Sequence, residues 1–174
     1  MRDRAILALG ADGTLTARQL KLYYGVDERA LRGLPYKDAQ VRPVHSRPSA
    51  SARVRFYAFD EETLRYRSDT ALSHMAGVAA IRFQLGIPPG EWSTRPTSGE
   101  HNHPDAEYKE QQSGRRIAVE YDSGTYVRQL VREKMQHFEA TYGGVVWGVV
   151  SPVRGERIHR RHPDARVVDA TWWA

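Results

Sequence analysis

The sequence predicts an α/β protein, of the α+β type, in which helices and strands follow one another in two successive parts. Two observations support this fold class. Residues 2–34 carry apolar side chains at helical spacing with capping residues between them, whereas residues 53–59 alternate between apolar and polar side chains, as a half-buried strand does. From residue 73 onward the period changes to a helix, then to strands, then to a second helix and a last strand.

Three short helices are expected at the start of the chain. The first spans residues 2–9, where apolar side chains recur at helical spacing. Thr16 and Gln19 form a capping-box signature that opens the second helix. Asp27 can cap a third helix over residues 28–34, separated from the second by a glycine turn. This spacing is typical of a helix-turn-helix, in which the later helix lies in the major groove of DNA.

A hairpin is expected after these helices. Residues 53–59 form one strand and residues 40–44 can pair with it, at the edge of the sheet because Pro43 lacks an N–H donor. The tip, residues 45–52, is polar and rich in small side chains, so we expect it to project. Three helices followed by a basic hairpin describe a winged helix-turn-helix. The alternative is a structural or dimerising domain of the same shape.

The positive charge gathers in this first part. The chain has a net charge of +5 and a pI near 9.6, and between residues 29 and 57 seven basic side chains face only Asp38. Such an excess favours a polyanion, and double-stranded DNA is the expected partner. The alternatives are a solvated basic face and a surface that binds an acidic protein. The candidate DNA-binding residues are Arg29, Arg32, Lys37, Arg42, Arg47, Arg53 and Arg55.

Composition excludes several kinds of site. The chain has no cysteine, so disulfides, thiolate metal sites and cysteine nucleophiles are ruled out. No stretch approaches the ~18 apolar residues that a membrane span needs. We therefore expect a cytoplasmic protein that does not contact a membrane.

The polar stretch at residues 60–69 divides the chain into two expected domains, residues 1–62 and 70–174. Ser73 can cap the first helix of the second domain. The expected elements are, in order, a helix at 74–85, strands at 91–95, 104–110 and 115–121, a helix at 125–142 and a strand at 145–150.

Carboxylates and one lysine stand out in this second domain. Glu120 and Asp122 are two apart on a strand, so their side chains point the same way, and a hairpin would bring Asp105 alongside. Lys134 shares the inward face of its helix, an unusual place for a cation unless anions lie there. The cluster is interpreted either as a divalent-metal site for phosphodiester hydrolysis or as a salt bridge that holds helix to sheet.

Four segments resemble the replication-relaxation family, whose members combine a winged helix with a PD-(D/E)XK nuclease-like domain. They are Ser73-His74-Met75, Pro104-Asp105-Ala106, the run from Val119 to Thr125, and Lys134 with Tyr142. The resemblance covers most of the chain and implies an αβββαβ core in the second domain.

The resemblance also implies roles for the site residues. Asp105 and Glu120 would hold Mg²⁺, and the catalytic set would be Asp105, Glu120, Asp122 and Lys134. Asp122 stands where the third motif normally has lysine, and Lys134 resembles the relocated lysine of some members. The implied function is a DNA-binding protein, with Mg²⁺-dependent endonuclease or nickase activity in plasmid or phage replication. The alternative is a non-catalytic transcriptional or replication regulator whose nuclease-like domain serves homodimerisation or partner binding.

Overall fold

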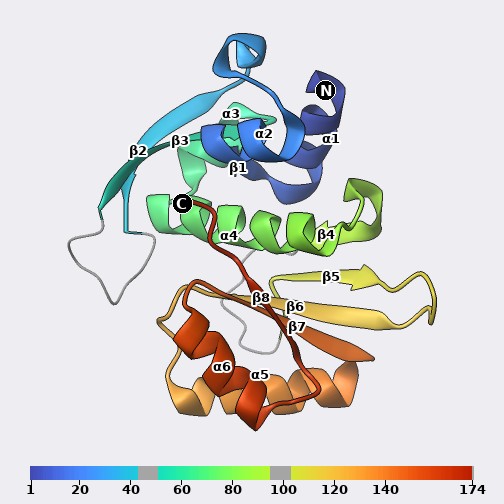
Figure 1. Ribbon diagram of the computed structural model, residues 1–174. Coiled ribbons are helices and arrows are strands. Elements are labelled where there is room, and N and C mark those ends of the chain that lie inside the picture. Colours follow the sequence, from blue (N-terminus) through green and yellow to red (C-terminus); the bar gives the residue numbers. More distant parts are fainter. Residues whose placement is uncertain (43–50, 95–102, 174) are drawn as a thin grey trace.

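The computed structural model describes residues 1–42, 51–94 and 103–173, and it has the expected mixture of helices and strands (Figure 1). The elements of the first part are α1 (Arg2–Asp12), β1 (Thr14–Thr16), α2 (Ala17–Tyr24), the 3-10 turn η1 (Glu28–Leu31), β2 (Tyr36–Val41), β3 (Ala52–Ala58) and α3 (Glu61–Tyr66). Those of the second part are α4 (Asp69–Leu85), the 3-10 turn η2 (Pro89–Glu91), β4 (Trp92–Thr94), β5 (Ala106–Lys109), β6 (Arg116–Asp122), α5 (Arg128–Thr141), β7 (Gly144–Val149), α6 (Pro152–Arg161) and β8 (Arg166–Asp169).

The strands form two sheets. The first has the order β1-β3-β2 and is antiparallel throughout, with Asp38 opposite Arg55. The expected hairpin pairing is confirmed, and β2 lies at the edge, although Pro43 and most of the tip lie outside the described residues. The second sheet has the order β4-β5-β6-β7-β8, antiparallel from β4 to β6 and parallel from β6 to β8.

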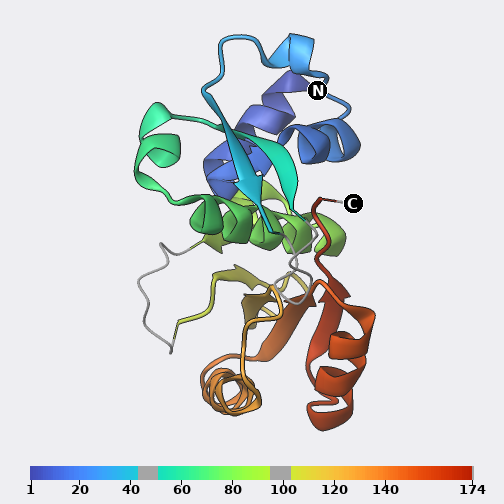
Figure 2. The same cartoon turned by 90° about the vertical axis from the view of Figure 1, so that its left-hand side faces the viewer.

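Helix α4 lies between the two sheets, and both views show it there (Figures 1 and 2). One core cluster contains side chains of the first sheet, of α4 and of the second sheet, among them Phe56, Ile81 and Val119. A second cluster lies between α1, α2 and the first sheet, and a third fills the space between the second sheet and helices α5 and α6. The two parts of the chain therefore share one core around α4.

The expected third helix is wrong. Only Glu28–Leu31 is helical, as a single 3-10 turn, and Asp27 makes no side-chain cap. Gly33 adopts a φ of 88°, which no L-amino acid favours, and Pro35 disfavours helical geometry at the residue before it. The chain therefore leaves the helix before residue 34.

Residues 60–69, expected as a polar boundary between the two parts, contain α3 and the start of α4. Asp60 caps α3 by accepting from the Thr63 N–H, and Ser68 caps α4 in the same way. The predicted cap, Ser73, lies inside α4, where its hydroxyl donates to the Asp69 carbonyl at 2.8 Å. Helix α4 therefore begins five residues earlier than expected.

The remaining expected elements of the second part are present with shifted ends, in the order helix, three strands, helix, strand. Helix α6 and strand β8 follow them. Among the described residues, no helix has both the length and the apolar character needed to cross a membrane.

Candidate functional site

A buried ion pair joins helix α5 to strand β6. The Nζ of Lys134 lies 2.6 Å from the Oε1 of Glu120, and the Tyr126 hydroxyl donates to the same oxygen at 2.7 Å. Glu120 has no exposed surface and Lys134 is 6% exposed, with its ammonium group over the rings of Tyr126 and Phe138. The expectation that Lys134 points inward to an acidic partner is confirmed, and solvent hardly reaches the contact.

Asp105 lies at the start of β5 and connects β6 to α4. Its Oδ2 accepts from the backbone N–H of Tyr121 at 2.8 Å. Its Oδ1 lies 2.9 Å from the Nε2 of His74, at ion-pair distance but without the angle of a hydrogen bond. Both oxygens of Asp105 therefore have protein neighbours.

Asp122 has a separate cation. Arg154, on α6, donates from Nε to the Asp122 Oδ2 at 2.6 Å, and the Gly124 N–H donates to Oδ1 at 2.8 Å. The expected convergence of three carboxylates on one lysine is therefore wrong: Asp122 shares the sheet face of Glu120 but pairs with α6, which the sequence did not reveal as a helix.

Burial controls the protonation of this cluster. Desolvation, together with repulsion from Asp105, raises the pKa of Glu120 to about 8, although Lys134 and Tyr126 favour its charged form. Burial by itself would lower the pKa of His74, but the carboxylates of Asp105 and Glu120 outweigh it, so the pKa of His74 is raised. The cluster thus retains protons that the same groups would release in water.

The described residues do not fit a magnesium ion. The Oε2 of Glu120 is buried without a hydrogen-bond partner, the one feature that invites a cation. Mg²⁺, however, keeps several water ligands, and Glu120 has no exposed surface where water could enter. Among the described residues, no three His, Asp or Glu side chains are grouped closely enough to hold a metal.

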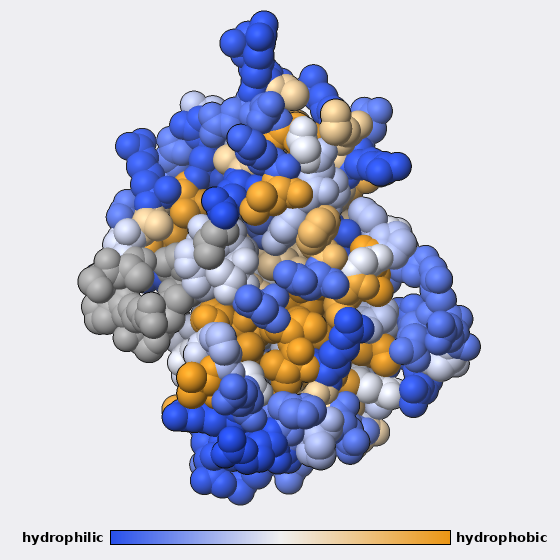
Figure 3. All heavy atoms as spheres, viewed as in Figure 1, coloured by the Kyte–Doolittle hydropathy of each residue, from blue (hydrophilic) through white to orange (hydrophobic). Residues whose placement is uncertain are grey.

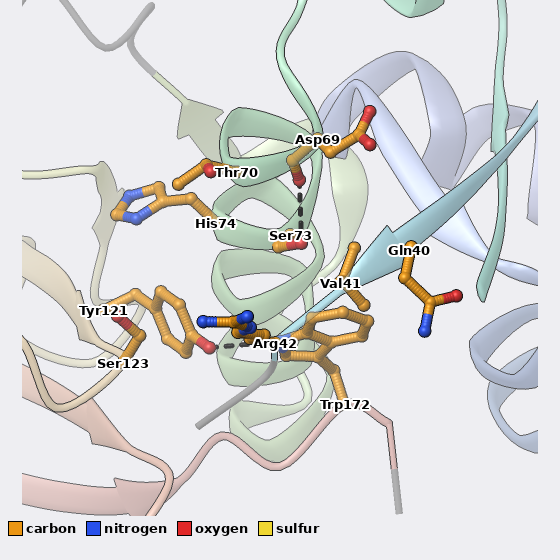
Figure 4. Close-up of a pocket in the computed structure, with 10 residues that line it drawn as sticks. All are labelled: Gln40, Val41, Arg42, Asp69, Thr70, Ser73, His74, Tyr121, Ser123 and Trp172. Atoms are coloured by element: carbon orange, nitrogen blue, oxygen red, sulfur yellow. Dashed lines mark hydrogen bonds between the residues drawn. The ribbon is translucent and has the colours of Figure 1, made fainter. Parts of the chain in front are cut away.

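A pocket of about 320 Å³ lies beside the cluster (Figure 4). It is lined by His74 and Ser73 of α4, by Tyr121 and by the exposed Arg42 at the end of β2. The Trp172 indole N–H donates to the Tyr121 hydroxyl at 3.0 Å across it. Glu120 and Lys134 are not among the lining residues, so the pocket meets the cluster through His74 and Tyr121, which both contact Asp105.

The candidate DNA-binding residues differ in how their charge is used. Lys37 pairs with Asp69 at 2.8 Å. Arg55 donates to both oxygens of Asp38, at 2.8 and 3.0 Å, and Arg53 approaches the same carboxylate at 3.4 Å. Lys37 and Arg55 therefore have acidic partners that are distant in the sequence, whereas Arg53 shares Asp38 with Arg55 and its side chain is 77% exposed.

The remaining candidate DNA-binding residues are Arg29, Arg32, Arg42 and Arg47. Arg29 and Arg32, on and just after η1, are exposed and have no ion pair with any described residue. Arg42 is equally exposed, and Arg47 lies outside the described residues. The charge available to a polyanion in the first part is therefore smaller than the sequence suggests and gathers at η1.

Sequence reasoning missed a second buried ion pair. Arg82 donates from Nε and Nη2 to the two oxygens of Asp12, at 2.8 and 2.6 Å, and both residues are almost fully buried. Arg82 also donates to the Tyr24 hydroxyl and to the Ile87 carbonyl. The only sequence signal was an arginine among the apolar residues of α4.

Comparison of the chain with family models, with curated proteins and with solved structures finds no match. The resemblance to the replication-relaxation family stays a prediction, and the function is argued from the residues themselves.

Proposed function

We propose that this chain is a DNA-binding protein whose first part contacts duplex DNA, and that its buried acid–lysine cluster holds the second part together. The observation that carries the proposal is the topology of the first part. Its elements run helix, strand, helix, turn and hairpin, with sheet order β1-β3-β2. The two helices and the hairpin support the winged-helix interpretation, although a 3-10 turn stands in place of the third helix. The unpaired Arg29 and Arg32 lie at the turn that takes the place of the recognition helix.

The mode of contact differs from insertion of a long helix. A single 3-10 turn offers few side chains to base edges, whereas exposed arginines suit phosphate oxygens. Binding is therefore governed mainly by the DNA backbone and depends little on sequence. The available cations at η1 are Arg29 and Arg32.

The test measures binding of a fluorescently labelled duplex by anisotropy. Changing Arg29 and Arg32 together to glutamine should weaken binding roughly tenfold or more, because two phosphate contacts are lost. The control changes Arg115 and Arg166 to glutamine, which removes the same charge at a different cavity, where Glu110, Glu139 and Asp164 already lie. Equal loss in both pairs of substitutions would show that only net charge matters and would overturn the proposal.

A second candidate function is metal-dependent DNA cleavage, as the nuclease-like resemblance implies. It is favoured by the unpartnered Oε2 of Glu120 and by the nearby Asp105. A supercoiled-plasmid assay with Mg²⁺, Mn²⁺ or EDTA separates the two functions. We expect no nicking under any of these conditions. The second function would be established by nicking that requires metal and that is lost in both Glu120→Gln and Asp105→Asn.

A further inference from the structure

Helices α5 and α6 lie on the face of the second sheet opposite α4 (Figure 2). Residues of these two helices line a basic groove. Its volume is about 1040 Å³, and no aspartate or glutamate lines it. Hydrophilic side chains gather over α6 on the face shown in Figure 3. The arginines of the groove are Arg128 and Arg132 from α5 and Arg154, Arg157, Arg160 and Arg161 from α6.

Five of these six arginines are free. Only Arg154 is held in place. It pairs with Asp122, and its Nη2 donates a hydrogen bond to the Tyr126 carbonyl at 2.7 Å. The other five are exposed and have no ion pair or hydrogen bond with any residue that the structure describes. The groove therefore has a fixed cation in its wall and a set of uncommitted cations around it.

The spacing of the free arginines produces two charged rows. Arg128 and Arg132 are one turn apart on α5, and Arg157 and Arg161 are one turn apart on α6. Like charges four residues apart destabilise a helix. Among the described residues, Glu133, Glu139 and Glu156 of these helices make no ion pair with the free arginines and do not line the groove, and Glu139 lies 3.8 Å from the Nδ1 of His162.

We propose that this groove binds the phosphodiester backbone of duplex DNA, as a second contact apart from η1. The proposal rests on the proposed function, because it takes the same ligand. Two rows of cations along an open groove suit a chain of phosphates better than one small anion, and arginine pairs with phosphate oxygens through two parallel hydrogen bonds. In Figure 1 helices α5 and α6, which line the groove, lie at the bottom of the molecule, and η1 lies at the top. Contacts at both ends let one molecule hold two DNA segments.

The experiment compares two pairs of substitutions in the full chain. Changing Arg157 and Arg161 to glutamine removes one row, while Arg115→Gln with Arg166→Gln removes the same charge elsewhere. The first pair should weaken binding of a labelled duplex roughly tenfold or more. It should also lower the slope of log Kd against log salt by about 2. The Kd of the control variant should stay within about twofold of that of the unchanged protein. Circular dichroism checks that each variant is folded.

Two outcomes overturn the inference. An effect of the groove substitutions no larger than that of the control pair removes the groove as a site. The second outcome is a competition experiment in which polyglutamate and unlabelled DNA displace the labelled duplex equally well per negative charge. That result would assign the groove to acidic proteins.

Failure of the inference is distinguishable from failure of the proposed function. If Arg29→Gln with Arg32→Gln weakens binding and the groove pair does not, only the groove inference fails. If the unchanged protein does not bind a duplex at low salt, both fail.

Discussion

Arg82 joins helix α4 to helix α1 through its buried ion pair with Asp12. Its guanidinium group is 4% exposed and its partner Asp12 is fully buried, so neither charge has water as an alternative partner. Removing one member of such a pair leaves the other charge buried and uncompensated. Asp12→Ala should lower the free energy of unfolding by roughly 3–5 kcal/mol, as measured by urea denaturation.

The double variant Asp12→Ala with Arg82→Met provides the control, because it removes both charges and fills the space with an apolar side chain. It should recover a large part of the loss. A cost of the single substitution below about 1 kcal/mol, the range of exposed pairs, would show that the pair is solvated.

Glu120 makes stability depend on pH. Its pKa rises from 4.5 in the unfolded chain to about 8 in the folded protein, so folding retains a proton that the unfolded chain releases. Its contribution is fully present below pH 4.5 and is lost as pH rises to about 8, and His74, whose pKa is also raised from 6.5, acts in the same direction above that value. The melting temperature should fall between pH 5 and pH 8.5.

Glu120→Gln replaces the carboxylate with a neutral group of the same shape and should flatten this decrease. The two melting temperatures, of the variant and the unchanged protein, are to be compared across the pH range by circular dichroism. Stability that instead rises with pH in the unchanged protein would mean that Lys134 keeps Glu120 ionised.

At the scale of elements, α4 packs against β6 through a glycine. A Cβ built on Gly77 would lie 2.2 Å from the Cζ of Tyr121, and a shift of the tyrosine ring would disturb the hydrogen bond that its hydroxyl accepts from the Trp172 indole N–H. Gly77→Ala should therefore destabilise the protein by about 1–3 kcal/mol in urea denaturation, in spite of the better helix propensity of alanine.

Gly10 supplies the matched control. It lies in helix α1, and nothing stands within 4 Å of the position its Cβ would take. Gly10→Ala should leave stability unchanged or raise it by up to about 1 kcal/mol. Equal effects at the two glycines would contradict the close packing of α4 on the sheet.

The sequence predicted elements best where their signals are local. The capping box of Thr16 and Gln19 is present, and the helical period of α5 places Lys134 inward as expected. The sequence did not reveal helix α6, although Pro152 occupies a favoured position in its first turn. The helix is rich in arginine and has few apolar residues that could recur at helical spacing. The length of the helix at η1 was overestimated, because the backbone conformation at Gly33 ends it although a capping residue precedes it.

The candidate site was predictable only in part, for a physical reason. Strand parity and helical period place Glu120 and Lys134 on facing surfaces, so their contact could be expected. The partners of Asp105 and Asp122 come from His74 and Arg154, on helices whose packing no local pattern specifies. Contacts between side chains of different elements therefore determine which carboxylates lie apart from Lys134.

At the scale of the whole molecule, the shared core predicts cooperative unfolding. Val41 and Phe56 of the first sheet pack in the same cluster as residues of α4 and the second sheet. Trp92 and Trp147 lie in the second part, and Trp172 packs against Phe56 of the first sheet, with the ring centroids 5.8 Å apart. Fluorescence therefore reports on the second part and on its contact with the first sheet, whereas far-UV circular dichroism reports on the helices and strands of both parts. The two signals should give coincident transitions in urea.

The fragment of residues 1–62 should accordingly lack a cooperative transition of its own, since it would expose the apolar face that α4 covers. A separate circular-dichroism transition after the fluorescence change is complete would instead assign the two parts as independent domains.

The salt dependence of DNA affinity tests the central claim most directly. Anisotropy of a labelled duplex, titrated with the full chain at 50 to 300 mM salt, gives log Kd at each concentration. If phosphate contacts by free arginines produce the binding, log Kd rises linearly with log salt, with a slope near the number of contacts, and neither Mg²⁺-free buffer with EDTA nor a change of DNA sequence alters it greatly. An affinity that does not change with salt, or no binding at the lowest salt, would contradict the account.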